Sequence, residues 1–148
     1  QILQKANFPF VIVGGYSAVL HGSSMVTQDL DICIPFNKDG IEKLRDILKD
    51  YSPVHRQLPQ KLSFLEHPQS LDNLKNLYLN TSLGVLDILG VVGGVGDFEK
   101  VSKNALEITF CGRPCKIISI DDLIKAKEFM GRPKDLMTIK ELNCIKES

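Results

Sequence analysis

Apolar residues recur along the chain with two different periods, and these periods predict where strands and helices lie. Residues 10–13 form a continuous apolar run typical of a buried strand, and residues 30–34 alternate apolar with polar, which predicts a strand with one polar face. From residue 39 to residue 48 the apolar positions are three or four apart, the spacing of an amphipathic helix. Further strands are expected at residues 62–65, 77–79, 85–89, 105–111 and 114–118, and further helices at residues 16–21, 122–130 and 134–146. The last helix carries four apolar residues on one side, namely Leu136, Ile139, Leu142 and Ile145.

The mixed order of strands and helices, with hairpins among the strands, predicts one α/β (α+β) domain over residues 1–148, built on a mixed β-sheet flanked by helices. Eighteen basic residues balance eighteen acidic ones, so the composition does not favour a broad electrostatic grip on nucleic acid or on an anionic membrane. The four cysteines fit no zinc-ligand spacing. The longest apolar stretch, residues 83–95, is too short to span a bilayer, and no secretory signal is visible. We therefore expect reduced cysteines, no membrane association and a cytoplasmic location.

Two carboxylates lie two positions apart in the second strand. Asp29 and Asp31 therefore share one face of that strand, and like charges held this close disfavour each other's ionisation unless a cation lies between them. Hard divalent ions with oxygen ligands, above all Mg²⁺, suit such a pair. Asp87 is the best third partner because its apolar neighbours Leu86 and Ile88 bury the strand around it. The alternative is that Asp29 and Asp31 are ordinary solvent-facing residues, although two aspartates in one short strand are uncommon.

A glycine pair, Gly14-Gly15, separates the first strand from the helix that follows it. Backbone without side chains can approach a phosphate closely there, the helix N–H groups would face it, and Ser17 offers a hydroxyl. Glycines in this position are also common as simple turn formers. No Gly-Lys-Ser/Thr sequence follows, so the segment is not a P-loop.

The glycine pair and the aspartate pair become a specific motif when their separation along the chain is considered. Gly14-Gly15, thirteen intervening residues and then Asp29-Leu-Asp-Ile closely resemble the signature of the DNA polymerase β-like nucleotidyltransferase superfamily. Asp87 stands where that family places its third carboxylate, on a neighbouring strand. The run from Ile120 to Lys127 and the sequence Gly-Arg-Pro-Lys-Asp at 131–135 also resemble the tail of its small bacterial and archaeal members. The resemblance implies the nucleotidyltransferase (polymerase β-like) fold.

The resemblance also implies an activity: metal-dependent transfer of a nucleoside monophosphate from a nucleoside triphosphate, such as ATP, to an acceptor hydroxyl or phosphate. Asp29 and Asp31 would hold two Mg²⁺ ions, with Mn²⁺ as a possible substitute, and Asp87 would complete the ion that activates the acceptor. The residues expected to contact the nucleotide are Gly14, Gly15, Ser17, Thr27 and Lys127. Arg132 and Lys134 are either further phosphate contacts or solvated residues at a helix end.

The acceptor is open: an RNA 3′ end, a protein side chain or a small molecule such as an aminoglycoside-type drug. Small members of the superfamily often act with a partner protein in toxin–antitoxin-like pairs, which slightly favours RNA or protein. One departure from the pattern is Met25, where many small members carry an arginine. This departure leaves an alternative open: a catalytically inactive nucleotide-binding or regulatory module of the same fold. The presence of all three aspartates argues against that alternative.

Overall fold

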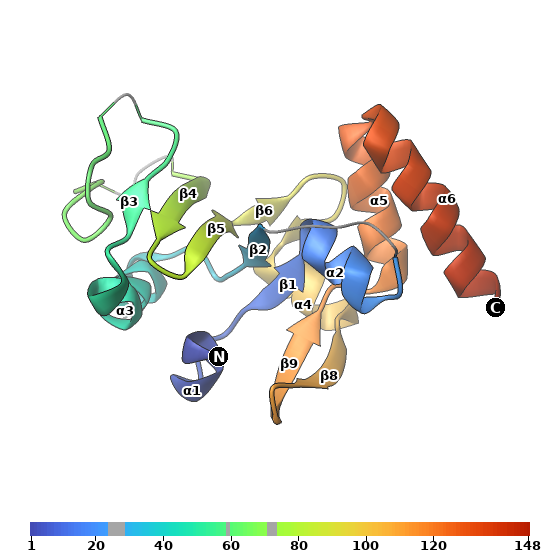
Figure 1. Ribbon diagram of the computed structural model, residues 1–148, viewed down its shortest axis with the longest axis horizontal. Coiled ribbons are helices and arrows are strands. Elements are labelled where there is room, and N and C mark those ends of the chain that lie inside the picture. Colours follow the sequence, from blue (N-terminus) through green and yellow to red (C-terminus); the bar gives the residue numbers. More distant parts are fainter. Residues whose placement is uncertain (24–28, 59, 71–73) are drawn as a thin grey trace.

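A mixed seven-stranded β-sheet lies at the centre of the molecule (Figure 1). The computed structural model describes residues 1–23, 29–58, 60–70 and 74–148. The strand order is β3-β4-β5-β2-β1-β9-β8, in which β2 is parallel to β5, β1 is parallel to β9 and the remaining pairs are antiparallel. The strands are β1 (Val11–Val13), β2 (Leu30–Cys33), β3 (Val54–His55), β4 (Asn76–Thr81), β5 (Gly84–Leu89), β8 (Leu106–Phe110) and β9 (Arg113–Ile117), with a separate ribbon of β6 (Val91–Val92) and β7 (Gly96–Asp97).

Helices cover both faces of this sheet. They are α1 (Ile2–Lys5), α2 (Gly14–Leu20), α3 (Lys38–Leu48), α4 (Phe98–Asn104), α5 (Ile120–Met130) and α6 (Pro133–Glu147), with a 3₁₀ turn, η1 (Lys49–Tyr51), after α3. Figure 1 shows α3 below β3 and β4 at one end of the sheet, and α5 packed against α6 at the other. The predicted mixed sheet with flanking helices is confirmed. Within the described ranges, no helix combines the length and the apolar character needed to cross a bilayer.

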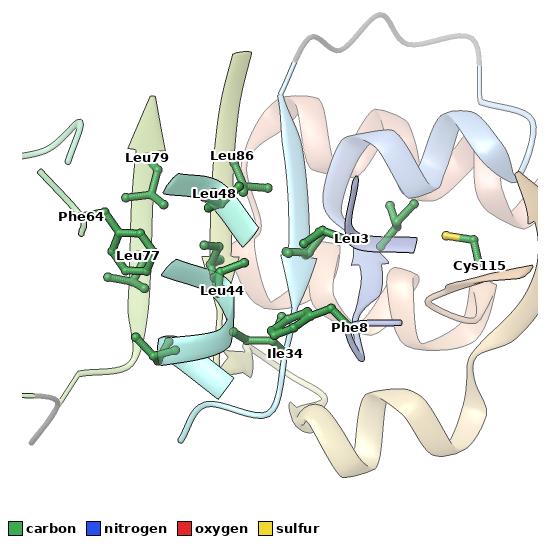
Figure 2. Close-up of a cluster of buried hydrophobic side chains, with 14 of the residues drawn as sticks. Leu3, Phe8, Ile34, Leu44, Leu48, Phe64, Leu77, Leu79, Leu86 and Cys115 are labelled. Atoms are coloured by element: carbon green, nitrogen blue, oxygen red, sulfur yellow. The ribbon is translucent and has the colours of Figure 1, made fainter. Parts of the chain in front are cut away.

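The alternation of β2 and β5 divides the core into two parts. On one face Ile32 and Ile88 are fully buried in a cluster that includes Leu44 and Leu48 of α3. Figure 2 shows these two leucines against the leucines of β4 and β5. On the other face Cys33 belongs to a second cluster, with side chains from β1, α4, α5 and α6. Each fully buried aliphatic side chain contributes about 1.5–3 kcal/mol to the free energy of unfolding. The two clusters therefore determine which side chains of β2 lie on each face of the sheet.

Local signals set where α3 and α5 begin and where α5 ends. Ser119 caps α5 by accepting a hydrogen bond from the Asp122 amide (3.1 Å), and Gly131 closes the same helix in the left-handed conformation with φ +64°. Asn37 caps α3 in the same way, through the Gly40 amide (2.7 Å). The helices predicted at 39–48, 122–130 and 134–146 are therefore present, each extended by one or two residues at its ends.

Three sequence predictions differ from the structure. The glycine pair does not precede the helix expected at 16–21 but forms its first residues, since α2 is Gly14–Leu20. The strand expected at 62–65 is absent; that segment forms one isolated bridge, between Ser63 and Val54, and the regular strand is β3. Three prolines break the periodicity there, so the pattern could not fix which side of the turn pairs with β4. In α6 the apolar positions do not form one buried side, because Leu136 is 52% exposed while Asp135 and Thr138 are buried beside Leu142. The helix turns polar side chains inward, and the reason lies in the site.

Candidate active site

One row of side chains crosses the sheet and carries the carboxylates. The parallel pairing of β2 with β5 sets Asp31 level with Asp87, and the neighbouring strands set Val13 and Tyr78 level with them. Residues level with each other on adjacent strands project to the same face. Asp29 lies two residues before Asp31, just outside β2. The three predicted aspartates are therefore brought together.

They line a cavity of about 270 Å³ between the sheet and the two last helices. Gly15 and Ala18 of α2 contribute to its wall. The opposite wall comes from α5, α6 and the turn between them, with Lys127, Arg132, Lys134, Asp135 and Thr138. An acidic surface thus faces a basic one across a space large enough for part of a small molecule.

Crowding of the carboxylates changes the protonation of Asp31. Burial, followed by the charge of Asp87, a hydrogen bond with Asp87 and the charge of Asp29, raises the pKa of Asp31 to about 7, while Lys127 opposes the shift. At neutral pH this carboxyl therefore competes for a proton, because burial and the neighbouring acids outweigh the charge of Lys127. A hard divalent cation with oxygen ligands would supply that charge, so Asp29 and Asp31 fit a magnesium-type ion by their chemistry.

Gly14 links the glycine pair to the aspartates. It has φ +70°, and a Cβ placed on it would collide with the Asp31 carboxylate. Glycine is required here both for the left-handed backbone and for the close approach of Asp31. The glycine at position 14 thus has a direct structural cause, and the phosphate contact expected from the sequence stays a prediction.

The other predicted nucleotide contacts differ in accessibility. Gly15 faces the cavity, and Lys127 does so with a side chain that is 13% exposed. Ser17 is fully buried, and its hydroxyl donates to the Gly14 carbonyl (2.6 Å), which stabilises the first turn of α2. Thr27 and Met25 lie outside the described residues.

A buried carboxylate organises the basic wall, and sequence reasoning assigned it no role. Asp135 is 1% exposed and accepts from the Arg132 side chain through both oxygens (2.6 and 3.2 Å) and from the Arg132 amide (3.2 Å). Lys127 lies 3.4 Å from the same carboxylate. Burial by itself would raise the pKa of Asp135, but the Arg132 hydrogen bonds and the two positive charges outweigh it and lower the pKa. A capping-box spacing at the start of α6, with the acid three residues after the cap, was the available signal.

A second functional residue missed from the sequence is Arg56. It follows β3 and donates to both oxygens of Asp87, with Nη1–Oδ1 2.5 Å and Nη2–Oδ2 3.1 Å. Among the residues that the structure describes, no three His, Cys, Asp or Glu side chains are arranged to hold a metal ion. The Arg56 guanidinium already gives Asp87 a cation from the chain itself. No periodicity marked Arg56, since its partner lies thirty-one residues later on another strand.

Comparison with known proteins shows which solved structures share this fold. No protein-family model and no curated protein sequence matches the chain. The lincosamide antibiotic adenylyltransferase LnuA, solved with lincomycin bound, is similar over 97% of this chain and 91% of its own, with 18% identity and a TM-score of 0.61. ANT(2″)-Ia, solved in complex with adenylyl-2″-tobramycin, is similar over 99% of this chain and 84% of its own, with 16% identity and a TM-score of 0.61. The chain has the nucleotidyltransferase fold.

A third solved structure agrees. The Thermotoga maritima protein TM1012, which carries a provisional nucleotidyltransferase assignment, is similar over 89% of this chain and 80% of its own, with 17% identity and a TM-score of 0.55. The fold predicted from the resemblance to the DNA polymerase β-like superfamily is thereby confirmed. At these identities the likeness concerns the fold, and the chemistry has to be argued from the residues of this chain.

Proposed function

We propose that this protein is a metal-dependent nucleotidyltransferase that moves a nucleoside monophosphate from a nucleoside triphosphate to an acceptor hydroxyl. One observation carries the proposal: the carboxylates of Asp29, Asp31 and Asp87 face Lys127 and Arg132 across a single cavity. Such a site binds a cation on one side and a polyanion on the other, which is what a metal–triphosphate complex requires.

The residues divide the work by charge. Asp29 and Asp31 would hold Mg²⁺, or Mn²⁺ in its place, and the ion when bound would neutralise charge on the reacting phosphate. Lys127 and Arg132 would bind the triphosphate oxygens, with Gly14 and Gly15 giving the backbone close access. The acceptor oxygen attacks the α-phosphorus, the bond to the β-phosphate breaks and pyrophosphate leaves, while a carboxylate on the acceptor side takes the hydroxyl proton.

For the acceptor, we place a small-molecule hydroxyl before RNA and protein. LnuA is described as a lincosamide antibiotic adenylyltransferase and ANT(2″)-Ia was solved with adenylyl-2″-tobramycin, and each is matched over most of its own length. The balanced charge of this chain, eighteen acidic and eighteen basic residues, gives no added support for a nucleic-acid acceptor. An RNA 3′ end or a protein, including a partner of the toxin–antitoxin kind, forms the other arms of the test.

The test is label transfer. The purified protein is incubated with Mg²⁺ and each α-labelled nucleoside triphosphate in turn, over lincomycin, tobramycin, a short RNA with a free 3′ hydroxyl, and a protein mixture. We expect transfer from one preferred triphosphate, and a loss of at least about 10²-fold in the Asp29→Asn and Asp31→Asn variants, because each removes charge from the cation site.

The matched control is Asp50→Asn, which removes one exposed carboxylate from the turn after α3. This variant should transfer label at the wild-type rate. Transfer that survives both Asp29→Asn and Asp31→Asn would refute the assigned chemistry. Triphosphate binding without transfer to any acceptor would instead favour the nucleotide-binding module.

A further inference from the structure

Arg56 reaches the carboxylates from the edge strand of the sheet. Its amide donates to the Tyr78 carbonyl (2.8 Å), which continues the β3–β4 pairing by one residue and brings Arg56 level with Tyr78 and Asp87. The side chain then extends along this row to Asp87. Its two terminal nitrogens donate to the two carboxylate oxygens, the paired geometry in which arginine recognises a carboxylate most strongly.

The position of this guanidinium is fixed on a second side. Its carbon lies 5.7 Å from the centre of the Tyr78 ring, within cation–π range. The side chains of Arg56 and Asp87 are only 29% and 15% exposed, so solvent screens the pair less than it screens a surface salt bridge. The ion pair of Arg56 and Asp87 is therefore a structural contact at this edge of the sheet and not an ordinary surface salt bridge.

This arrangement changes what Asp87 can do. A divalent ion bound by Asp87 would lie close to the guanidinium and be repelled by it, while both oxygens already accept hydrogen bonds. Asp29 and Asp31 differ, because the two carboxylates line the same cavity two residues apart, an arrangement that favours a cation between them. The resemblance to nucleotidyltransferases predicts two ions, one of them completed by Asp87; the pairing with Arg56 favours another assignment.

We propose that the Arg56 guanidinium takes the cation position at Asp87, so that the protein binds one divalent ion, on Asp29 and Asp31. Asp87 then takes the proton of the hydroxyl group that attacks the nucleotide. Arg56 neutralises the charge of Asp87 and positions its carboxylate. This role rests on the proposed function, whereas the metal stoichiometry does not.

The experiment measures Mn²⁺ binding to the metal-free protein by calorimetry, without nucleotide or acceptor. We expect one ion per wild-type chain, weakened about tenfold or more by Asp31→Asn and little changed by Asp87→Asn. Arg56→Gln should create a second binding event, and the double variant Arg56→Gln/Asp87→Asn should lose it again. Arg56→Lys, which keeps the positive charge, should bind one ion like the wild type.

Arg113→Gln is the matched control, since it removes an exposed arginine from β9, on the far side of β1 from the carboxylates. Thermal melting of each metal-free variant shows whether it folds. Two ions on the wild type, strong loss of binding in Asp87→Asn, or an unchanged single event in Arg56→Gln would each overturn the proposal. Because no transfer is measured, a protein without nucleotidyltransferase activity could still show the expected pattern, and an active enzyme could still fail it.

Discussion

The two walls of the cavity are built from the same kinds of residue in opposite proportions. The acidic wall holds Asp29, Asp31 and Asp87 with one arginine from the sheet edge. The basic wall holds Lys127 and Arg132 with one buried carboxylate, Asp135. The residue of minority charge is paired within each wall: Arg56 with Asp87, and Asp135 with both Arg132 and Lys127. The surplus charge of each wall lies at the cavity that the two walls share. The surplus is what a ligand of opposite charge would meet.

Asp31 and Asp135 show how the proportions determine the chemistry. Both carboxyls are largely buried, and burial pushes the pKa of each upward. The charges of Asp87 and Asp29 outweigh that of Lys127 at Asp31, and its pKa rises to about 7. At Asp135 the hydrogen bonds and charges come from Arg132 and Lys127, and its pKa falls. A carboxylate whose charge is compensated inside the fold stabilises structure. A carboxylate whose charge is not fully compensated inside the fold favours binding of an external cation.

The largest effect is expected from removing the charge of Asp135. Asp135→Asn leaves Lys127 and Arg132 without their carboxylate and should lower the free energy of unfolding by about 3 kcal/mol, since breaking a buried ion pair leaves a charge uncompensated. The same change frees both cations to move, so we expect KM for the triphosphate to rise at least about tenfold. Urea unfolding and initial-rate kinetics measure the two effects.

The control is Asp121→Asn, which breaks an ion pair of another kind. Asp121 and Lys146 are 2.5 Å apart, but their side chains are 59% and 51% exposed. We expect no measurable change in stability or KM, because solvent and salt screen this pair. If Asp121→Asn and Asp135→Asn behaved alike, burial would not be what separates a structural carboxylate from a surface one.

What the sequence predicted well was local or spaced along one segment. The hairpins β4–β5 and β8–β9 and the helices α3, α5 and α6 follow from short-range patterns. The glycine pair was identified from its position, but its contact with Asp31 appears only in the structure. The meeting of Asp31 with Asp87 required the register of two strands far apart in the chain, and only the family resemblance supplied it.

The minority charges of both walls were missed for physical reasons. Arg56 directly follows the two-residue strand β3, and the strand that pairs with it, β4, begins twenty residues after Arg56, so the pairing leaves no periodic trace in the sequence. Asp135 was hidden by the apolar residues around it, which predicted an apolar inner side for α6. In the structure α6 buries Asp135, which binds the cations of the cavity. This burial depends on tertiary contacts between α6 and α5, which the local pattern does not contain.

A smaller effect is expected when pH changes the charge of Asp31. Its pKa is about 7 in the folded protein and 3.8 as the reference value, so the folded state binds more protons between these limits. Stability of the metal-free protein should therefore fall as pH rises from 5 to 8, by roughly 2.5 kcal/mol. Unfolding in urea with EDTA, at pH 5 and pH 8, measures the loss. Mg²⁺ at pH 8 should restore it, because the cation takes the place of the proton.

Comparison with Asp31→Asn isolates this carboxyl from the other titrating groups. The variant should be more stable than the wild type at pH 8 and show a smaller loss between the two pH values, and Mg²⁺ should stabilise it little. An equal pH dependence in both proteins would mean that Asp31 does not carry the proton, and the contrast with Asp135 would fail.

The smallest effect concerns the glycine that lets Asp31 into its position. Gly14 and Gly112 have similar backbone angles, φ +70° and φ +77°, but a Cβ on Gly14 meets the Asp31 carboxylate and one on Gly112 meets nothing within 4 Å. Both Gly→Ala variants should lose about 1 kcal/mol from the left-handed conformation. Gly14→Ala should lose about 1 kcal/mol more and weaken Mn²⁺ binding, because Asp31 has to move. Equal losses in both, with Mn²⁺ affinity unchanged in Gly14→Ala, would show that the acidic wall tolerates displacement, and that the glycine serves the turn alone.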